Sequence, residues 1–265
     1  MHRKPHSDLM LTRRFNLVDT VVILVLIVGL ALILVSPSRI HWSGTSPFDS
    51  STPESQDLKQ AYGPGSNSEH EEEWIIRDYF QDRRDGVFID VGANHYQRYS
   101  NTYYLETVMG WSGVAVEPQR EFEAGYTTHR PRTRFLPFFV SDWSDEQATL
   151  YVLEHNKLVT SADRSFTERF GIGAHQITAP TITLNDLLAT EEVGHFDFLS
   201  IDVELHEPQV LAGFDLRRFR PALVCIEAHP EVRQPILDYF TQRGYVIVAK
   251  YLRADTHNLY FKPMS

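Results

Sequence analysis

Residues 87–94, VFIDVGAN, join a short apolar run to a turn at Gly92. A run of this length and character is typical of a strand that is buried on both faces of a parallel sheet. A glycine directly after such a strand lets the chain turn sharply, and it lets backbone N–H groups approach a ligand closely. Many strands end in this way, so the meaning of the turn depends on the sequence around it.

Similar apolar runs follow along the chain, and helical patterns separate them. Strands are predicted at residues 87–91, 113–116, 135–140, 196–203 and 222–226, with a closing pair at 245–251 and 258–262. Helices are predicted from Trp74 to Phe80, over residues 100–109, before Gly194 with Asn185 or Asp186 as the cap, and over residues 208–213. Strands that alternate with helices predict a three-layer α/β domain with right-handed crossovers.

The composition fits one globular domain with accessory segments. The chain has 265 residues, of which 42% are hydrophobic and 23% are charged, close to the average of globular proteins. Its net charge of −10 argues against a protein that grips nucleic acid by the phosphates, so no nucleic-acid partner is predicted. The single cysteine, Cys225, excludes an internal disulfide and a zinc site built from several thiolates.

The first 68 residues divide into three segments that precede the domain. Residues 1–16 are basic, and residues 17–35 are almost wholly apolar. A helix over 17–35 is roughly 28 Å long, close to the thickness of a bilayer core, so we predict a single-pass membrane protein. A buried core helix and a cleaved signal peptide are the alternatives. Residues 36–68, rich in Ser, Pro and Gly, are predicted to be a disordered linker, and residues 69–265 form the domain.

The residues that follow each strand are the candidates for a ligand site, because ligands bind beyond the carboxyl ends of the strands in such a sheet. Glu117 ends the second strand, where a carboxylate can accept hydrogen bonds from both ribose hydroxyls of a nucleoside. A surface acid that closes the strand is the alternative. Asp202 lies near the end of a run that predicts a central strand, and Glu204 points the same way if the strand continues. Asp202 either takes part in a reaction there or caps the following helix.

Seven stretches together resemble the FkbM-type family of S-adenosylmethionine-dependent methyltransferases. They are FIDVGAN at 88–94, SNT at 100–102, GWSGVAVEP at 110–118, VSD at 140–142, TITLNDLL at 181–188, IDVELHE at 201–207 and RPALVCIE at 220–227. The resemblance covers about residues 74–262, with the motifs in family order.

The resemblance implies a Rossmann-like class I methyltransferase fold, with a mostly parallel seven-stranded sheet whose last strand is reversed. It implies S-adenosyl-L-methionine as cofactor and transfer of a methyl group, usually to oxygen. By position, the cofactor-binding residues are Asp90, Gly92 and Asn94 in the first loop, Glu117 at the ribose, and Ser141 and Asp142 beside the adenine. Asp202 and Glu204 are the catalytic residues, facing the reacting methyl group and the acceptor.

Two positions depart from the family pattern. Tyr96 stands where a glycine is common, two residues after Asn94, and Leu205 stands where the pattern Asp-x-Glu-Gly-x-Glu has its glycine. A leucine side chain at that position could narrow the acceptor site or move the backbone around Glu204. These departures bear on catalysis more than on cofactor binding.

The remaining candidates define the alternatives. His206 and His229 follow strands and could join Asp202, Glu204 and Glu227 around a divalent ion, but no closely spaced histidine pair fixes the geometry, so no metal is predicted.

We predict a membrane-anchored methyltransferase that acts on a hydroxyl of a small-molecule, glycan or lipid acceptor. A non-catalytic membrane adaptor built on a methyltransferase-like domain is the alternative. A nucleotide-binding oxidoreductase is disfavoured because the first turn lacks Gly-x-Gly-x-x-Gly.

Overall fold

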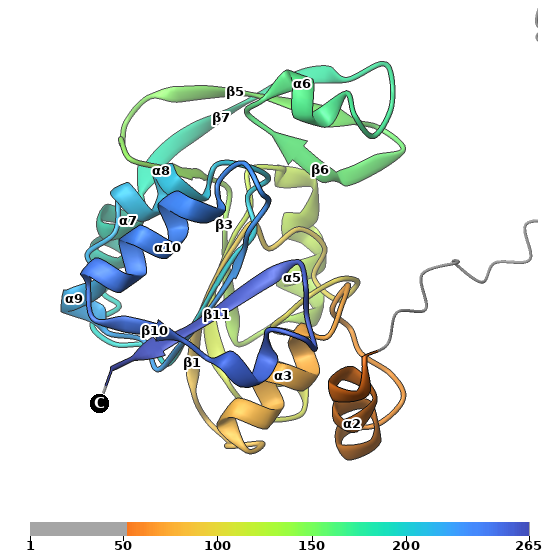
Figure 1. The fold of residues 1–265 in the computed structure, drawn as a ribbon. Coiled ribbons are helices and arrows are strands. Elements are labelled where there is room, and N and C mark those ends of the chain that lie inside the picture. The colour runs from red at the N-terminus through yellow and green to blue at the C-terminus, as the bar shows by residue number, and fades with distance from the viewer. Residues whose placement is uncertain (1–51, 265) are drawn as a thin grey trace, which may run out of the picture. The chain divides into compact units, whose positions relative to one another are not determined.

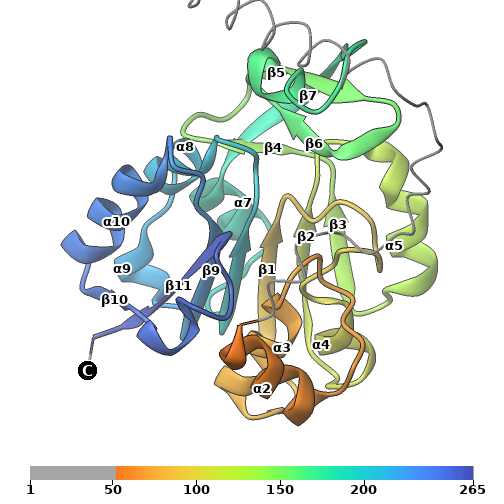
Figure 2. The same ribbon diagram turned by 45° about the vertical axis from the view of Figure 1, so that its right-hand side comes forward.

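A seven-stranded sheet forms the centre of residues 52–264, the part of the chain that this computed structural model describes (Figures 1 and 2). Its strands are β1 (Val87–Val91), β2 (Ser112–Val116), β3 (Thr133–Leu136), β8 (Phe198–Ile201), β9 (Leu223–Glu227), β10 (Tyr245–Ile247) and β11 (Asn258–Pro263). Their order across the sheet is β10-β11-β9-β8-β1-β2-β3, and only β11 runs antiparallel to its neighbours. The predicted Rossmann-like sheet, mostly parallel with a reversed last strand, is confirmed.

Helices cover both faces of this sheet, as its buried strands require. On one face, Phe88 of β1 and its register partner Phe198 of β8 are fully buried. They pack in the layer of α3 (Glu72–Phe80), α4 (Tyr103–Thr107) and α5 (Glu123–His129). On the other face, Ile89 and Leu199 pack in the layer of α7 (Leu184–Thr190), α8 (Glu207–Ala212), α9 (Leu216–Phe219) and α10 (Arg233–Gln242). The strand order reverses between β1 and β8, which is where such a sheet opens a ligand crevice.

A second sheet of four strands, β4-β7-β5-β6, lies across the upper part of the domain in Figure 1. It consists of β4 (Phe139–Ser141), β5 (Gln147–Leu153), β6 (Asn156–Ser161) and β7 (His175–Thr183), with α6 (Arg164–Thr167) between the last two. The predicted strand 135–140 is therefore two strands in two sheets. Pro137 divides them, because proline has no N–H for a ladder and the chain turns there, with Phe138 N donating to Leu136 O at 3.0 Å.

Part of the predicted linker is a helix, which corrects the assignment of residues 36–68 as disordered. Helix α2 spans Pro53–Tyr62, Thr52 caps its N-terminus, and proline occupies its first position, as it favourably can. Leu58 is buried in the apolar cluster of Trp74, and Ser55 Oγ donates to Glu71 Oε1 at 2.7 Å. These contacts with the start of α3 provide the burial that the Ser/Pro/Gly composition does not predict. Residues 36–51 lie outside the described residues.

The predicted single-pass membrane location is corrected. Within residues 52–264, no helix is both long enough and apolar enough to cross a bilayer. The stretch 17–35, on which the prediction depended, lies outside the described residues.

Candidate active site

A pocket lies at the carboxyl ends of β1, β2 and β8 and is covered by residues of the second sheet. It encloses about 790 Å³ of space, part of it open to solvent. The predicted residues that line it are Gly92, Asn94, Glu117, Asp202 and Glu204. Its other walls were not predicted: apolar side chains of Phe138, Phe139, Val140, Leu150 and Leu158, and polar ones of Glu69, Glu72, Tyr99, Asn101, Gln119 and Thr160.

Gly92 is where the ends of β1 and β8 touch. Its φ of +84° favours glycine, and a Cβ at this position would lie 1.7 Å from the carbonyl oxygen of Asp202. Backbone hydrogen bonds fix the approach, since Gly92 N donates to Val116 O at 2.9 Å and Asp202 N donates to Val91 O at 2.9 Å. Any side chain at residue 92 would therefore have to push two strand ends apart.

Glu117 lies at the β2 end with both carboxylate oxygens already hydrogen-bonded to the backbone. Asn94 N donates to Oε2 at 3.1 Å, and Gln119 N donates to Oε1 at 2.9 Å. Burial raises the pKa of Glu117 to about 7, although these two N–H groups oppose the shift. A carboxylate oxygen can accept two hydrogen bonds, so each oxygen keeps a position for a ligand.

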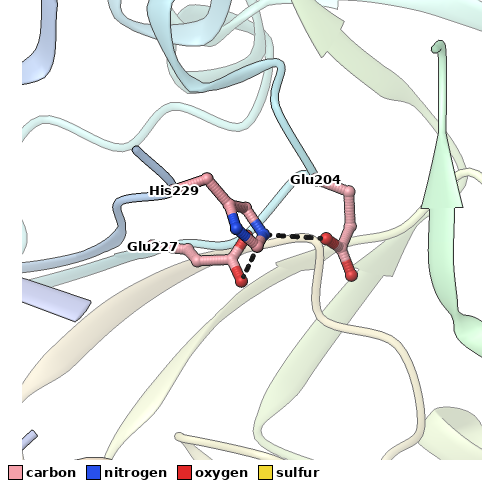
Figure 3. A group of neighbouring side chains, drawn as sticks. All are labelled: Glu204, Glu227 and His229. Carbon is pink, nitrogen blue, oxygen red and sulfur yellow. Dashed lines mark ion pairs between the residues drawn. The ribbon is translucent and has the colours of Figure 1, made fainter. Parts of the chain in front are cut away.

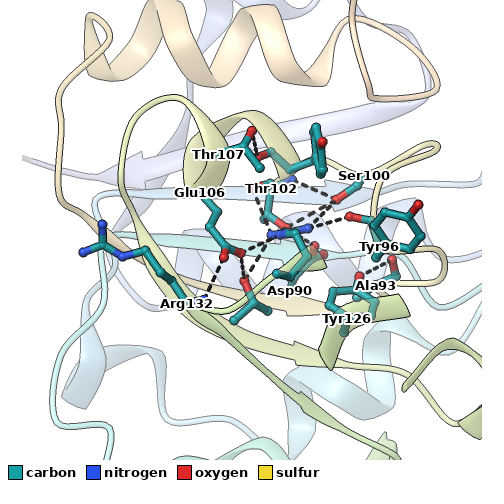
Figure 4. A network of polar contacts seen from close by, with 12 residues as sticks. Asp90, Ala93, Tyr96, Ser100, Thr102, Glu106, Thr107, Tyr126 and Arg132 are labelled. Atoms are coloured by element: carbon teal, nitrogen blue, oxygen red, sulfur yellow. Dashed lines mark hydrogen bonds and ion pairs between the residues drawn. The ribbon is translucent and has the colours of Figure 1, made fainter. Parts of the chain in front are cut away.

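Asp90 is placed behind the pocket and does not line it. Thr102 Oγ1 donates to Asp90 Oδ2 at 2.8 Å, within the buried network shown in Figure 4. Arg130 organises that network: its Nε lies 2.5 Å from Glu106 Oε2, and its Nη1 donates to the carbonyl of Tyr96 at 2.8 Å. Burial raises the pKa of Asp90 to about 6. Asp90 lies near the end of β1, as predicted, but its side chain points into the buried network under the loop after β1 and not into the pocket.

Tyr96, one of the two departures from the family pattern, is also directed away from the pocket lining. Its ring stacks on His95 and on His129, with centroid distances of 4.4 and 4.6 Å. The first loop is further fixed by Tyr126, whose hydroxyl donates to Ala93 O at 3.0 Å. The missing glycine therefore places no side chain in the pocket.

Ser141 and Asp142, predicted beside the adenine, do not line the pocket either. Ser141 is fully buried, with Oγ 2.9 Å from His206 Nε2, and it also donates to Asp142 Oδ1 at 3.2 Å. Val140, one residue earlier, lines the pocket. The pocket lining of this strand thus ends at Val140, and contact of Ser141 and Asp142 with the adenine stays a prediction.

Asp202 and Glu204 reach the pocket from the loop after β8. The side chain of Asp202 is exposed and lines the pocket. Desolvation by the surrounding protein raises its pKa well above the usual value, and repulsion from Glu227 and Glu204 adds to the effect. Burial and Glu227 likewise raise the pKa of Glu204 to about 7, against the opposing effect of His229. Both groups therefore hold their protons more tightly than an ordinary carboxylic acid does.

The backbone of this loop adopts two consecutive left-handed conformations. Glu204 has φ of +54° and Leu205 has φ of +77°, a region that favours glycine. Ser161 Oγ from β6 donates to the carbonyl of Glu204 at 2.6 Å and so holds the turn. The conformation explains the family glycine at this position, and Leu205 adopts it with a strained backbone.

Glu204 also approaches Glu227, the last residue of β9, and His229, which follows that strand (Figure 3). His229 Nε2 lies 3.1 Å from Glu227 Oε1 and 3.5 Å from Glu204 Oε2. Hydrogen bonding and charge from the two glutamates raise the pKa of His229 to about 10. The motif at 220–227 marks Glu227 in the sequence, but only the fold brings it beside Glu204.

A second cavity, an open groove, shares Glu204 with the pocket. It encloses about 780 Å³, including open solvent, and is lined by Tyr151, Ser161, Ala162, Asp163, Arg164, Glu204, Leu205, His206 and Gln209. Tyr151 and Ser161 belong to the second sheet, Arg164 to α6 and Gln209 to α8, and the other five lie in the loops before these two helices. Glu204 thus stands at the boundary of a more enclosed cavity and an open one.

Comparison with known proteins gives a family and a set of distant structural neighbours. The Methyltransferase FkbM domain matches residues 90–247. Precorrin-6y C5,15-methyltransferase from Geobacter metallireducens is similar at 9% identity and a TM-score of 0.42, over 73% of this chain and 87% of its own. A TehB-like methyltransferase from Corynebacterium glutamicum is similar at 12% identity and a TM-score of 0.41, over 78% and 93%. A search of curated proteins found no match.

Proposed function

Because the chain belongs to the FkbM methyltransferase family, whose methyl donor is S-adenosyl-L-methionine, we propose that it methylates a hydroxyl group of its acceptor. One observation carries the proposal: Glu204 lines both the pocket at the switch point and the adjoining open groove. A methyl donor in the pocket and an acceptor in the groove would meet at this carboxylate.

The residues of the pocket fit the cofactor. Gly92 forms the turn that lines the pocket, and the buried Glu117 keeps acceptor positions suited to ribose hydroxyls. Phe139, Val140 and Leu150 form an apolar wall suited to an adenine ring. We assign Gly92, Asn94 and Glu117 to cofactor binding. Asp90, Ser141 and Asp142 support the strand ends that carry these contacts.

S-adenosylmethionine supplies a methyl group activated by its sulfonium. The chain has to align the acceptor oxygen with that methyl group, exclude water and accept the hydroxyl proton. Leu150 and Leu158 of the second sheet cover the pocket and limit water. Asp202 and Glu204 are the candidate bases, and a carboxylate whose pKa is near 7 is well matched to this task at neutral pH.

The non-catalytic alternative depended on Tyr96 and Leu205. The ring of Tyr96 packs between two histidines away from the pocket lining, and Leu205 lies beside the open groove while its backbone keeps the conformation of a glycine. Neither side chain blocks the pocket, which favours the enzyme over the adaptor.

The test combines cofactor binding with product analysis. Calorimetry of the full chain should detect S-adenosylhomocysteine and not NAD. Incubation with S-adenosylmethionine and a panel of hydroxylated small molecules, glycans and lipids should add one methyl group, located by mass spectrometry. Each acceptor is paired with its deoxy analogue, which should gain none. Cofactor binding without any product, or a methyl group found on nitrogen, would contradict the proposal.

A further inference from the structure

Glu204, Glu227 and His229 present three potential metal ligands to one point in space (Figure 3). Their ligand atoms all lie within 4.8 Å of one another, and His229 Nε2 is 3.1 and 3.5 Å from the two carboxylate oxygens. Ligands about 2.1 Å from one ion are separated by about 3.0 to 3.4 Å in octahedral or tetrahedral geometry. The two measured distances are therefore close to those of a ligand set around one ion.

Two buried carboxylate oxygens at this cluster have no hydrogen-bond partner. They are Oε2 of Glu227 and Oε2 of the fully buried Glu207. Buried polar atoms of this kind are costly unless something satisfies them. The two unpartnered oxygens are available to a bound cation.

The charges around the three residues are unbalanced. Asp202 and Glu207 add two carboxylates to those of Glu204 and Glu227. Among the ion pairs formed by residues 52–264, none joins a lysine or arginine to any of these four acids, and His229 is their only cationic partner. A divalent cation would balance the charge of these carboxylates when they are ionised.

We propose that Glu204, Glu227 and His229 bind a divalent transition-metal ion such as Mn²⁺ at the wall between the pocket and the groove. Mixed imidazole and carboxylate ligands suit such ions, and three protein ligands leave positions open for an acceptor oxygen. This role rests on the proposed function: the ion would orient the acceptor hydroxyl and favour loss of its proton. The competing explanation is an ion pair of protonated His229 with two glutamates, without a metal.

The experiment measures metal binding apart from activity. The full chain is stripped with a chelator, Mn²⁺ is titrated in, and free Mn²⁺ is followed by electron paramagnetic resonance. We expect saturable binding of one ion, weakened at least about tenfold by Glu227→Gln and by His229→Gln. Glu231→Gln is the matched control: Glu231 lies in the same loop and pairs with Arg169 at 2.8 Å, and its loss should leave Mn²⁺ affinity unchanged.

Affinity for S-adenosylhomocysteine shows whether each variant is folded, and it should stay within about threefold of the parent. Absence of Mn²⁺ binding by the parent, or equal binding by parent and both ligand variants, would overturn the metal site. If methyl transfer to a hydroxyl persists in that case, the proposed function stands without it. Specific Mn²⁺ binding with no methyl transfer to any acceptor would instead support the metal site and contradict the proposed function.

Discussion

At the β2 edge of the pocket, Glu117 accepts a backbone N–H on each carboxylate oxygen, whereas at the β8 and β9 edge the acids face one another and His229. The loop at the first edge has left-handed conformations at Gly92 and Asn94, residue types that adopt them readily, whereas the second edge has them at Glu204 and Leu205. At the first edge the backbone already holds the carboxylate in place, and the second edge keeps the unpartnered Glu227 Oε2 and a strained backbone. Such a contrast is expected where one edge recognises and the other reacts, since strain and unpaired groups gather at reactive sites.

Gly92→Ala tests the point where the two edges touch, and we expect the largest effect there. The new Cβ meets the carbonyl oxygen of Asp202 at 1.7 Å, so both strand ends must move. Unfolding free energy should fall by about 3 kcal/mol or more, and calorimetry should detect no S-adenosylhomocysteine binding. Gly194→Ala is the control, because nothing lies within 4 Å of its Cβ. Normal cofactor binding by Gly92→Ala would show that the edges are less tightly joined than the distance implies.

Asp202→Asn tests the reactive edge alone. The amide keeps the size of the side chain but loses the base and the negative charge, so turnover should fall roughly 100-fold. Affinity for S-adenosylhomocysteine should stay within a few-fold. A parent rate in the variant would end the catalytic assignment of Asp202, and failure to fold would favour a capping role.

Glu117→Ala tests the recognising edge. The variant loses a buried carboxylate that has acceptor positions left for two hydroxyls, so cofactor affinity should fall at least about tenfold. Glu123→Ala, an exposed acid in the first turn of α5, serves as control in the same calorimetric titration. Equal affinity for the parent and Glu117→Ala would remove Glu117 from the site.

The pH dependence of stability sharpens the same contrast. Burial raises the pKa of Glu117 from 4.5 to about 7, so the folded state holds this proton more tightly than the unfolded state. The stability that protonated Glu117 contributes to the folded state is present in full below about pH 4.5 and is lost as the pH rises through about 7. Glu117→Gln should therefore melt progressively higher relative to the parent between pH 5 and 8 in the absence of ligand. A constant difference in melting temperature across that range would contradict the shifted pKa.

Substitutions of Leu205 should have the smallest effect, and they should reverse the usual order of stability of glycine and alanine variants. Both Leu205→Gly and Leu205→Ala lose the packing of the side chain, but only glycine adopts φ of +77° without strain. The glycine variant should be more stable than the alanine variant by about 1 kcal/mol, the reverse of their usual order in regular structure. Chemical denaturation of the two variants measures the difference, and a more stable alanine variant would place the strain elsewhere.

The sequence predicts the central sheet well and the second sheet poorly. Runs such as 87–91 are apolar throughout because both faces are buried, so the pattern is local and visible. β5 alternates exposed and buried residues, and β7 is largely polar with Pro180 inside it. These strands depend on pairing with each other, which no local pattern records. Helix α2 was missed for a similar reason, since Leu58 is buried only by its contact with the cluster of Trp74.

The sequence predicts which residues lie at the strand ends of the site, but it does not always predict which way their side chains point. Gly92, Asn94, Glu117, Asp202 and Glu204 line the pocket as expected. Asp90 and Ser141 stand at the expected strand ends, yet their side chains point into the buried interior, where Thr102 and His206 meet them. The approach of Glu227 and His229 to Glu204 depends on β8 and β9 being neighbours, a fact of topology that residue spacing does not contain.

The buried guanidinium of Arg130 has a consequence for how fast and how readily the pocket fills. This one side chain holds the carbonyls of Tyr96 and Thr102 and the carboxylate of Glu106, so the loop after β1 is rigid before any ligand arrives. A preorganised loop loses little conformational entropy on binding. Association should therefore proceed in a single kinetic phase, and amide hydrogen exchange in the loop should already be slow in the free protein.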